Sequence, residues 1–167
     1  MWHHARMDMK EWDARVDAWY EASFDESQPA ESLARMRELL ARHPDAGALI
    51  PFELAGVHDT LGLENEAVPL YQQALAEGLD EACAARARIQ LASTLRNLGR
   101  LEEAITLLSE PSGADADASR RAFLALALHS AGRHDEALRQ ALEALIPTLP
   151  RYRRSLSGYA AALTDDN

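Results

Sequence analysis

The chain repeats one nine-residue motif, the phrase, three times: GLENEAVPL at residues 62–70, GRLEEAITL at 99–107 and GRHDEALRQ at 132–140. In each copy a glycine is followed by glutamate at the fourth position, then by alanine and an aliphatic residue. The three glycines are 37 and 33 residues apart. A repeat of this length with no strand-like alternation is typical of stacked helix pairs. The phrase therefore predicts an all-α helical-repeat array.

Each position of the phrase has a structural reason. The glycine is expected to end one helix and reverse the chain, because glycine adopts the left-handed backbone easily. The glutamate opens the next helix, where the helix dipole favours an acid. The alanine that follows (Ala67, Ala104 or Ala137) lets two helices cross closely. We interpret the three glutamates as helix-opening residues and not as general acids.

The repeats divide a single domain, residues 1–167, into predicted units. Regular helix pairs are expected at 48–78, 80–110 and 118–146, with a degenerate hairpin before them at 8–43 and a capping helix after them at 151–163. The composition of residues 111–117 predicts a linker. Pro111 is expected to cut the second helix of the middle pair short.

Composition excludes several classes of protein. The chain is 47% hydrophobic and has one cysteine, Cys83, so no disulfide can form within it. No apolar run approaches the length of a membrane span, and the N-terminus has no secretory h-region, so a cytoplasmic location is expected. The net charge is −10, and the excess acid lies in residues 1–83. This asymmetry allows an acidic partner for the second half, or attraction between two copies of the chain.

The pattern of the three units resembles the tetratricopeptide repeat (TPR) family. The likeness rests on a Leu-Ala pair in the first helix, the glycine turn, the Glu-Ala pair and a small residue seven positions later. It covers residues 48–147, although Pro111 replaces that small residue in the middle unit. Small bacterial TPR proteins of unknown role, some thought to dimerise, look similar. The resemblance implies a right-handed superhelix of antiparallel helix hairpins and a protein–protein interaction module.

In that family the first helices line a concave face where partners bind. The positions of this chain carried over to that face are Phe52, Asp59, Arg86, Ile89, Ser93, Arg96, Asn97, Leu126, His129, Tyr152 and Tyr159. We expect Arg86, Arg96 and Asn97 to hold a carboxylate of a peptide or helix, because the guanidinium fork donates two parallel hydrogen bonds. The alternative is that these arginines are solvated or paired with acids of the chain.

The tryptophans suggest self-association as a homodimer. Trp2, Trp12 and Trp19 all lie near the N-terminus, and tryptophan is enriched in the cores of interfaces. The alternative is that the residues of one helical stripe only close the end of the array by packing against the next helix. The stripe is Trp12, Val16, Trp19 and Tyr20, and the residues it would pack against are Leu33, Met36 and Leu40.

Other chemistries find no support in the sequence. The histidines match no metal spacing, and no phosphate loop or nucleophile motif is present, so we predict no enzyme, no metal and no cofactor. Residues 151–154, Arg-Tyr-Arg-Arg, suit phosphate, but a net charge of −10 argues against nucleic acid. Cys83 is interpreted as a small packing residue.

Overall fold

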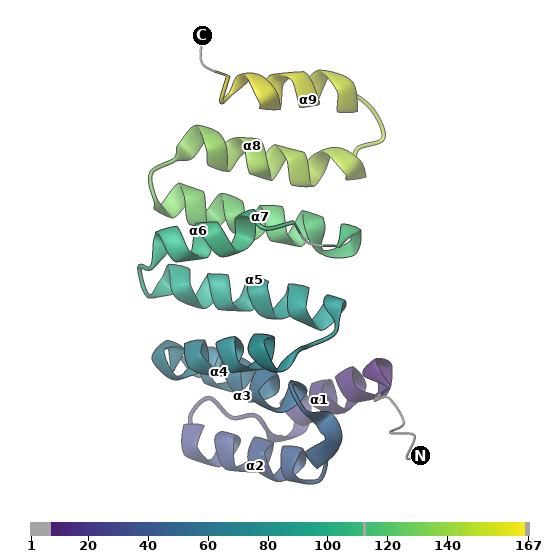
Figure 1. The fold of residues 1–167 in the computed structure, drawn as a ribbon, viewed down its shortest axis with the longest axis vertical. Helices are drawn as coiled ribbons and strands as arrows, with labels where there is room; N and C mark the ends of the chain where they lie inside the picture. The colour runs from purple at the N-terminus through teal and green to yellow at the C-terminus, as the bar shows by residue number, and fades with distance from the viewer. Residues whose placement is uncertain (1–7, 112, 166–167) are drawn as a thin grey trace.

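The structure is a computed structural model in which residues 8–111 and 113–165 are described. Apart from the first, its helices follow one another up a single stack that ends at the C-terminus, and the first helix lies above the second, beside the third (Figure 1). They are α1 (Met9–Ser23), α2 (Pro29–Ala41), α3 (Leu49–Thr60), α4 (Glu64–Glu77), α5 (Glu81–Asn97), α6 (Leu101–Ser109), α7 (Ala114–Ser130), α8 (His134–Leu145) and α9 (Arg153–Ala162), with short 3-10 turns at Pro44–Ala46 and Ile146–Thr148. The described residues contain no strand, which confirms the all-α prediction.

The repeated glycines end the first helix of each pair as predicted. Gly62, Gly99 and Gly132 have φ angles of 71°, 75° and 78°, in the left-handed region. The amide that follows each glycine donates a hydrogen bond to the carbonyl five residues before it, at 2.8 or 2.9 Å. This is the bond of a Schellman cap, which satisfies a carbonyl left free at the helix end. The same local geometry therefore closes α3, α5 and α7.

The alanines of the phrase set the spacing of the pairs. Ala67 and Ala104 are fully buried and Ala137 is nearly so. They belong to one continuous apolar core that also holds Leu91, Leu124 and the aromatic residues of α1. Because alanine carries only a methyl group, the helices of a pair approach closely and the larger leucines fill the space between pairs.

Two predicted boundaries were wrong. The segment 111–117 is mostly helix, because α7 begins at Ala114. Asp117 explains this early start, since it pairs with Arg120 and Arg121, three and four residues on, at 2.6 and 2.7 Å. Such pairs stabilise a helix. The last helix begins two residues later than predicted, because Tyr152 adopts a positive φ of 67° just before α9.

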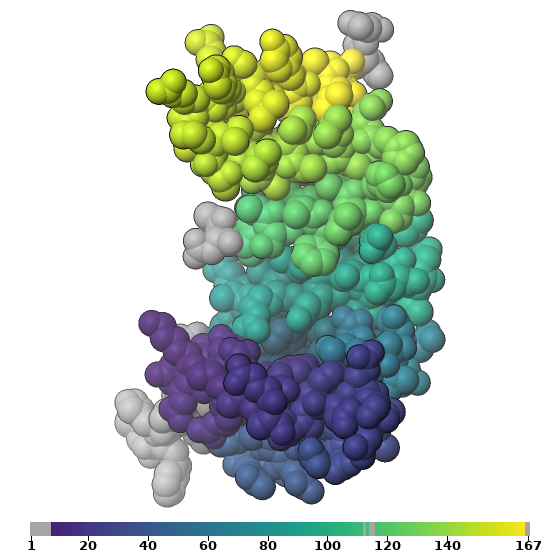
Figure 2. All heavy atoms as spheres, turned by 180° about the vertical axis from the view of Figure 1, so that it is seen from behind, coloured from purple at the N-terminus to yellow at the C-terminus, as the bar shows by residue number. Residues whose placement is uncertain are grey.

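The N-terminal helix departs from the regular pattern. Asp8 caps α1 by accepting a hydrogen bond from the amide of Lys10. The helix then reaches past its neighbour in sequence, α2, and bonds through its side chains to α3 and α5. From behind, α1 (purple) lies across the surface of the lower units (Figure 2). The first helix therefore packs differently from those of the regular pairs and covers part of the array.

The middle pair ends early and is closed by an arginine. α6 stops at Ser109, before Pro111, as the sequence predicted. The carbonyl of Leu108 accepts a hydrogen bond at 2.6 Å from Nη1 of Arg120 on α7, and this arginine is only 8% exposed. A buried guanidinium thus replaces the turn of helix that Pro111 removes, and it ties α6 to α7.

We predict that Arg120→Met lowers the free energy of unfolding by about 2 kcal/mol, because a buried carbonyl loses its charged donor while the aliphatic stem remains. Urea denaturation measures this loss. The matched control is Arg133→Met, which removes an exposed ion pair with Glu136 and is expected to cost about 0.5 kcal/mol or less. Equal losses in the two variants would contradict the capping role.

Candidate functional site

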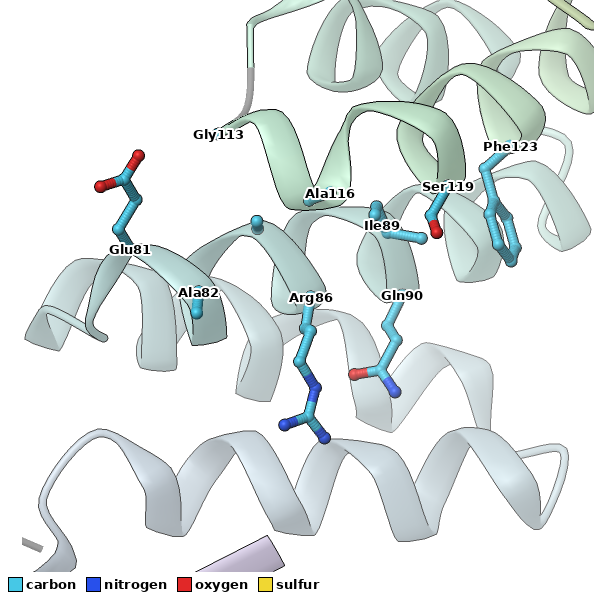
Figure 3. A pocket seen from close by; sticks show the side chains of 10 residues that line it. Glu81, Ala82, Arg86, Ile89, Gln90, Gly113, Ala116, Ser119 and Phe123 are labelled. Carbon is cyan, nitrogen blue, oxygen red and sulfur yellow. The ribbon is translucent and has the colours of Figure 1, made fainter. Parts of the chain in front are cut away.

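A groove of about 750 Å³ lies between α5 and α7, the first helices of two successive hairpins. We call it the α5–α7 groove. It is lined from α5 by Ala82, Ala85, Arg86, Ile89 and Gln90, and from α7 by Ala116, Ser119 and Phe123, with Glu81 and Gly113 at one end (Figure 3). Its walls are thus largely apolar, with a few polar groups placed along them. This is the usual composition of a binding pocket.

Arg86 on α5 lines the groove, and contacts with α1 and α3 hold its side chain in place. Its Nη1 donates a hydrogen bond to Oδ1 of Asp13 on α1 at 2.9 Å. Its guanidinium lies over the ring of Phe52, 5.6 Å from the centroid. Partial burial works against the charge, yet the bond to Asp13 raises the pKa of Arg86. The cation is therefore fixed by its own chain, while half of its side chain remains exposed to the groove.

Next to the groove, α1 docks on α3. Nε1 of Trp12 donates a hydrogen bond to Oε1 of Glu53 at 2.9 Å, and both side chains are buried. Burial raises the pKa of Glu53 to about 6, although the bond from Trp12 and the charge of Arg86 oppose the shift. The hydroxyl of Tyr20 lies 3.4 Å from where a Cβ on Gly56 would stand. A glycine inside α3 is thus explained by the close approach of α1.

Gln90 lies on α5 beside Arg86, and the two side chains project from the same side of the helix (Figure 3). Its Oε1 is buried and accepts no hydrogen bond from any residue that the structure describes. A buried acceptor without a donor costs free energy. Gln90 therefore contributes an unsatisfied acceptor to the protein interior beside the groove.

The family model described as tetratrico peptide repeat matches residues 48–163. The chain belongs to the tetratricopeptide repeat family. A comparison of structures gives the same fold: the crystal structure of YrrB, described as a TPR protein with an unusual peptide-binding site, matches with a TM-score of 0.52 at 15% identity. That match covers 95% of this chain and 88% of the YrrB chain. A search of curated proteins found no match. The α5–α7 groove is thus formed by first helices of successive TPR units.

The TPR positions predicted for the concave face do not all reach the groove. Arg86 and Ile89 line it. Phe52 is buried beneath Arg86 and packs against Tyr71, so it offers no surface to a partner. Asp59 is half-buried, and burial raises its pKa. Ser93 is half-buried and Asn97 is exposed, both outside the groove lining.

The predicted carboxylate site of Arg86, Arg96 and Asn97 is not assembled as one cluster. Arg86 is bonded to Asp13, and Nε of Arg96 donates to Oγ of Ser130 on α7 at 2.9 Å. Arg86 thus pairs with an acid of its own chain, which was the alternative expectation, but no sequence pattern indicated that the acid is Asp13. Arg96 therefore links α5 to α7, the first helices of two TPR units, and does not share a partner with Arg86.

The remaining predicted positions lie toward the C-terminal end. Leu126, Tyr152 and Tyr159 are exposed, the tyrosines by 77% and 72%. The ring of His129 packs at 4.8 Å from that of His134 across the Gly132 turn. The described residues hold no group of three metal-ligating side chains. Leu126, His129, Tyr152 and Tyr159 therefore lie outside the lining of the α5–α7 groove.

The tryptophans lie inside the array. Trp12 is 1% exposed and Trp19 is 8% exposed, and both pack in the core with Val16, Met36 and Leu40. Self-association through these two indoles therefore has no surface in this structure, and the packing alternative is the one observed. Trp2, the third residue of that hypothesis, lies outside the described residues.

The predicted site residues include two of the ten that line the groove, Arg86 and Ile89, and leave out the others, among them Gln90, Phe123, Ala116 and Ala85. Gln90 follows directly after Ile89, and Phe123 is its equivalent 33 residues on, so the repeat itself could have indicated both. Ala116 fell in the predicted linker and was not considered. Cys83 is buried, as predicted for a packing residue, and burial raises the pKa of its thiol to about 11. In the part of the chain that the structure describes, no helix is long and apolar enough to cross a membrane.

The raised pKa of Glu53 predicts a pH-dependent stability. The fold binds this proton more tightly than the unfolded chain, so stability is lost as the pH rises from about 4.5 to about 6. Glu53→Gln keeps an oxygen acceptor for Trp12 and carries no charge. We expect it to raise the free energy of unfolding by about 1–2 kcal/mol at neutral pH, with the gain vanishing in acid.

Urea unfolding of wild type and Glu53→Gln at several pH values measures this difference. Glu66→Gln, an exposed change in the first turn of α4, is the control and is expected to follow the wild-type curve. A constant difference between Glu53→Gln and wild type at every pH would contradict the buried carboxylate.

Proposed function

We propose that this TPR protein is an adaptor that binds a partner protein, as a peptide or a helix with acidic residues, in the α5–α7 groove. The observation that carries the proposal is the groove itself, an apolar hollow between two TPR first helices with an anchored arginine on its wall. Ile89 and Phe123 offer apolar surface to side chains of the partner. Binding a helix or peptide in such a groove is a common mode of recognition.

The magnitudes support a combined apolar and charged contact. A hydrogen bond to a charged group contributes about 1.5–3 kcal/mol, whereas micromolar affinity needs about 8 kcal/mol. Two such bonds from Arg86 and Arg96 therefore fall short. Burial of apolar surface adds about 25 cal/mol for each Å². The alanines that line the groove, together with Phe123, would therefore supply the larger share of the binding free energy. Acidic residues of the partner then set its orientation and specificity.

The second candidate function is self-association as a homodimer. Two features favour it: among the residues that the structure describes, the large exposed apolar side chains lie between Leu126 and Tyr159, and the acidic excess lies in the first half of the chain. Exposed tyrosines suit an interface core. In this case a second copy would cover the C-terminal surface, by which we mean the exposed side chains of Leu126, Leu138, Leu145, Tyr152 and Tyr159. The buried tryptophans, Trp12 and Trp19, would take no part.

Variants in the groove test the first candidate. Ala116→Trp fills the α5–α7 groove with an indole, and Arg96→Glu reverses a charge farther along α5. We expect cross-linked partners captured by the wild-type chain to be lost with Ala116→Trp and reduced with Arg96→Glu. Arg37→Glu, an exposed change on α2, is the matched control and is expected to leave capture unchanged.

Capture of the same partners by Ala116→Trp would contradict binding in the groove. Light scattering on the same samples separates the candidates. A dimer that persists in Ala116→Trp but dissociates when Tyr152 and Tyr159 are changed to Ser favours self-association through the C-terminal surface. A monomer at micromolar concentration rejects the homodimer.

A further inference from the structure

A second groove, of about 590 Å³, lies between α4 and α6, the second helices of two successive hairpins. We call it the α4–α6 groove. Leu91 and Leu95 of α5 line it, together with Leu75 of α4 and Leu107 of α6, and the last two remain partly exposed. It shares no lining residue with the α5–α7 groove. The α4–α6 groove is therefore a separate apolar surface, built on second helices and not on first helices.

The wall of this groove on α6 is acidic. Glu102, Glu103 and Glu110 line it and are exposed. Glu103 is bonded through both of its oxygens to Arg100, the residue before α6, whereas Glu102 and Glu110 form no ion pair with any residue that the structure describes. None of the described residues that line the groove carries a positive charge. Two carboxylates beside the leucines are thus open to a cation from outside the chain.

The next unit shows which group an acid at this position accepts. A shift of 33 residues takes Glu110, at the end of α6, to Glu143 of α8. Nε of Arg139 donates a hydrogen bond to Oε1 of Glu143 at 2.8 Å, and Arg121 of α7 pairs with the same carboxylate. Thr106 stands on α6 where Arg139 stands on α8, and α6 contains no arginine. Glu110 therefore lacks the guanidinium that its equivalent receives within the chain.

We infer that the α4–α6 groove binds a basic amphipathic helix of a partner protein, whose apolar stripe packs on the four leucines and whose arginines pair with Glu102 and Glu110. This goes beyond the proposed function, because it concerns another surface and a partner of the opposite charge. The net charge of −10 attracts such a helix at long range. An amphipathic helix laid in an apolar groove buries its stripe while its charged side chains stay at the rim.

The positions of the two open acids define the partner's sequence pattern. Glu102 lies in the first turn of α6, and Glu110 directly follows its last residue, eight positions later. Eight residues of helix span about 12 Å along the axis. A helix that lies alongside α6 therefore presents two arginines seven or eight residues apart, on one side of a stripe of leucines at three- and four-residue intervals.

The probe is a dye-labelled peptide of about 14 residues, built of leucine, alanine and arginine in this pattern and titrated with the full-length protein by fluorescence anisotropy. We call it the arginine–leucine peptide. One comparison peptide has glutamate in place of each arginine, and another has alanine in place of each leucine. We expect each of these to bind at least about 10-fold more weakly, because the first meets like charge and the second loses the apolar contact.

Thr106→Arg is the decisive variant. It places on α6 the arginine that α8 has at the equivalent position, four residues from both Glu102 and Glu110, which is the spacing of an ion pair within a helix. We expect it to fill the groove and weaken the arginine–leucine peptide about 10-fold, because it removes both charge pairs. Ser155→Arg adds the same charge at an exposed position of α9 and is the matched control, with a change below about 2-fold.

The acids are tested by neutralisation. Glu102→Gln with Glu110→Gln is expected to weaken the arginine–leucine peptide about 5-fold. Glu21→Gln with Glu38→Gln removes the same charge from exposed positions of α1 and α2, and is expected to weaken it by less than about 2-fold. A spin label on the peptide, which requires no change to the protein, is expected to broaden amide resonances of α4 and α6.

The α5–α7 groove provides a further control. Ala116→Trp, which fills that groove, is expected to leave binding of the arginine–leucine peptide unchanged. The proposed function is thus tested separately, since it predicts that Ala116→Trp abolishes capture of a different partner.

Several results would overturn the inference. Absence of binding, or equal binding of the alanine-substituted peptide, would reject the leucine contact. Equal weakening in Thr106→Arg and Ser155→Arg, or in the two double variants, would show that the peptide responds only to the net charge of the protein. Loss of binding in Ala116→Trp would move the peptide to the α5–α7 groove. Self-association of the wild-type chain that Thr106→Arg abolishes would assign the α4–α6 groove to a second copy and not to a partner.

Discussion

The hydrogen bond from the Trp12 indole to the buried carboxylate of Glu53 holds the N-terminal helix on the array. It connects α1 to α3 in the core, next to the Asp13–Arg86 pair that connects α1 to α5. Through these two contacts α1 occupies the first position of the concave surface and buries Phe52 under Arg86. The next pair of first helices, α5 and α7, lines the α5–α7 groove.

Equivalent positions of the three units share a backbone and differ in chemistry. Glu53, Gln90 and Phe123 occupy one position on α3, α5 and α7. The first accepts a bond from α1, the second is an unsatisfied acceptor, and the third is an apolar wall of the groove. The glycine turns and alanine contacts, by contrast, are the same in every unit. The residues that vary between units therefore give each site its own chemistry, and the shared phrase builds the frame that positions them.

The regular hairpins could be predicted from sequence because their causes are local. A glycine with positive φ, an alanine at a crossing and Pro111 after α6 each act within one turn of chain. The docking of α1 could not be predicted, since Trp12 and Glu53 are 41 residues apart and Asp13 and Arg86 are 73 apart, and no periodicity encodes either contact. The start of α7 was missed for a different reason: the composition of residues 111–117 hid the pairing of Asp117 with two arginines.

The most direct test of this account is the indole N–H resonance of Trp12 in the full-length protein, followed by NMR across the pH range around the pKa of Glu53. The account predicts a proton that exchanges slowly with water and shifts with a midpoint near the pKa of about 6 that burial gives Glu53. Trp19, whose indole nitrogen is buried without an acceptor among the described residues, provides the internal comparison and is expected to show no such titration. A Trp12 indole that exchanges as fast as an exposed one, with no shift through this range, would contradict the docking of α1.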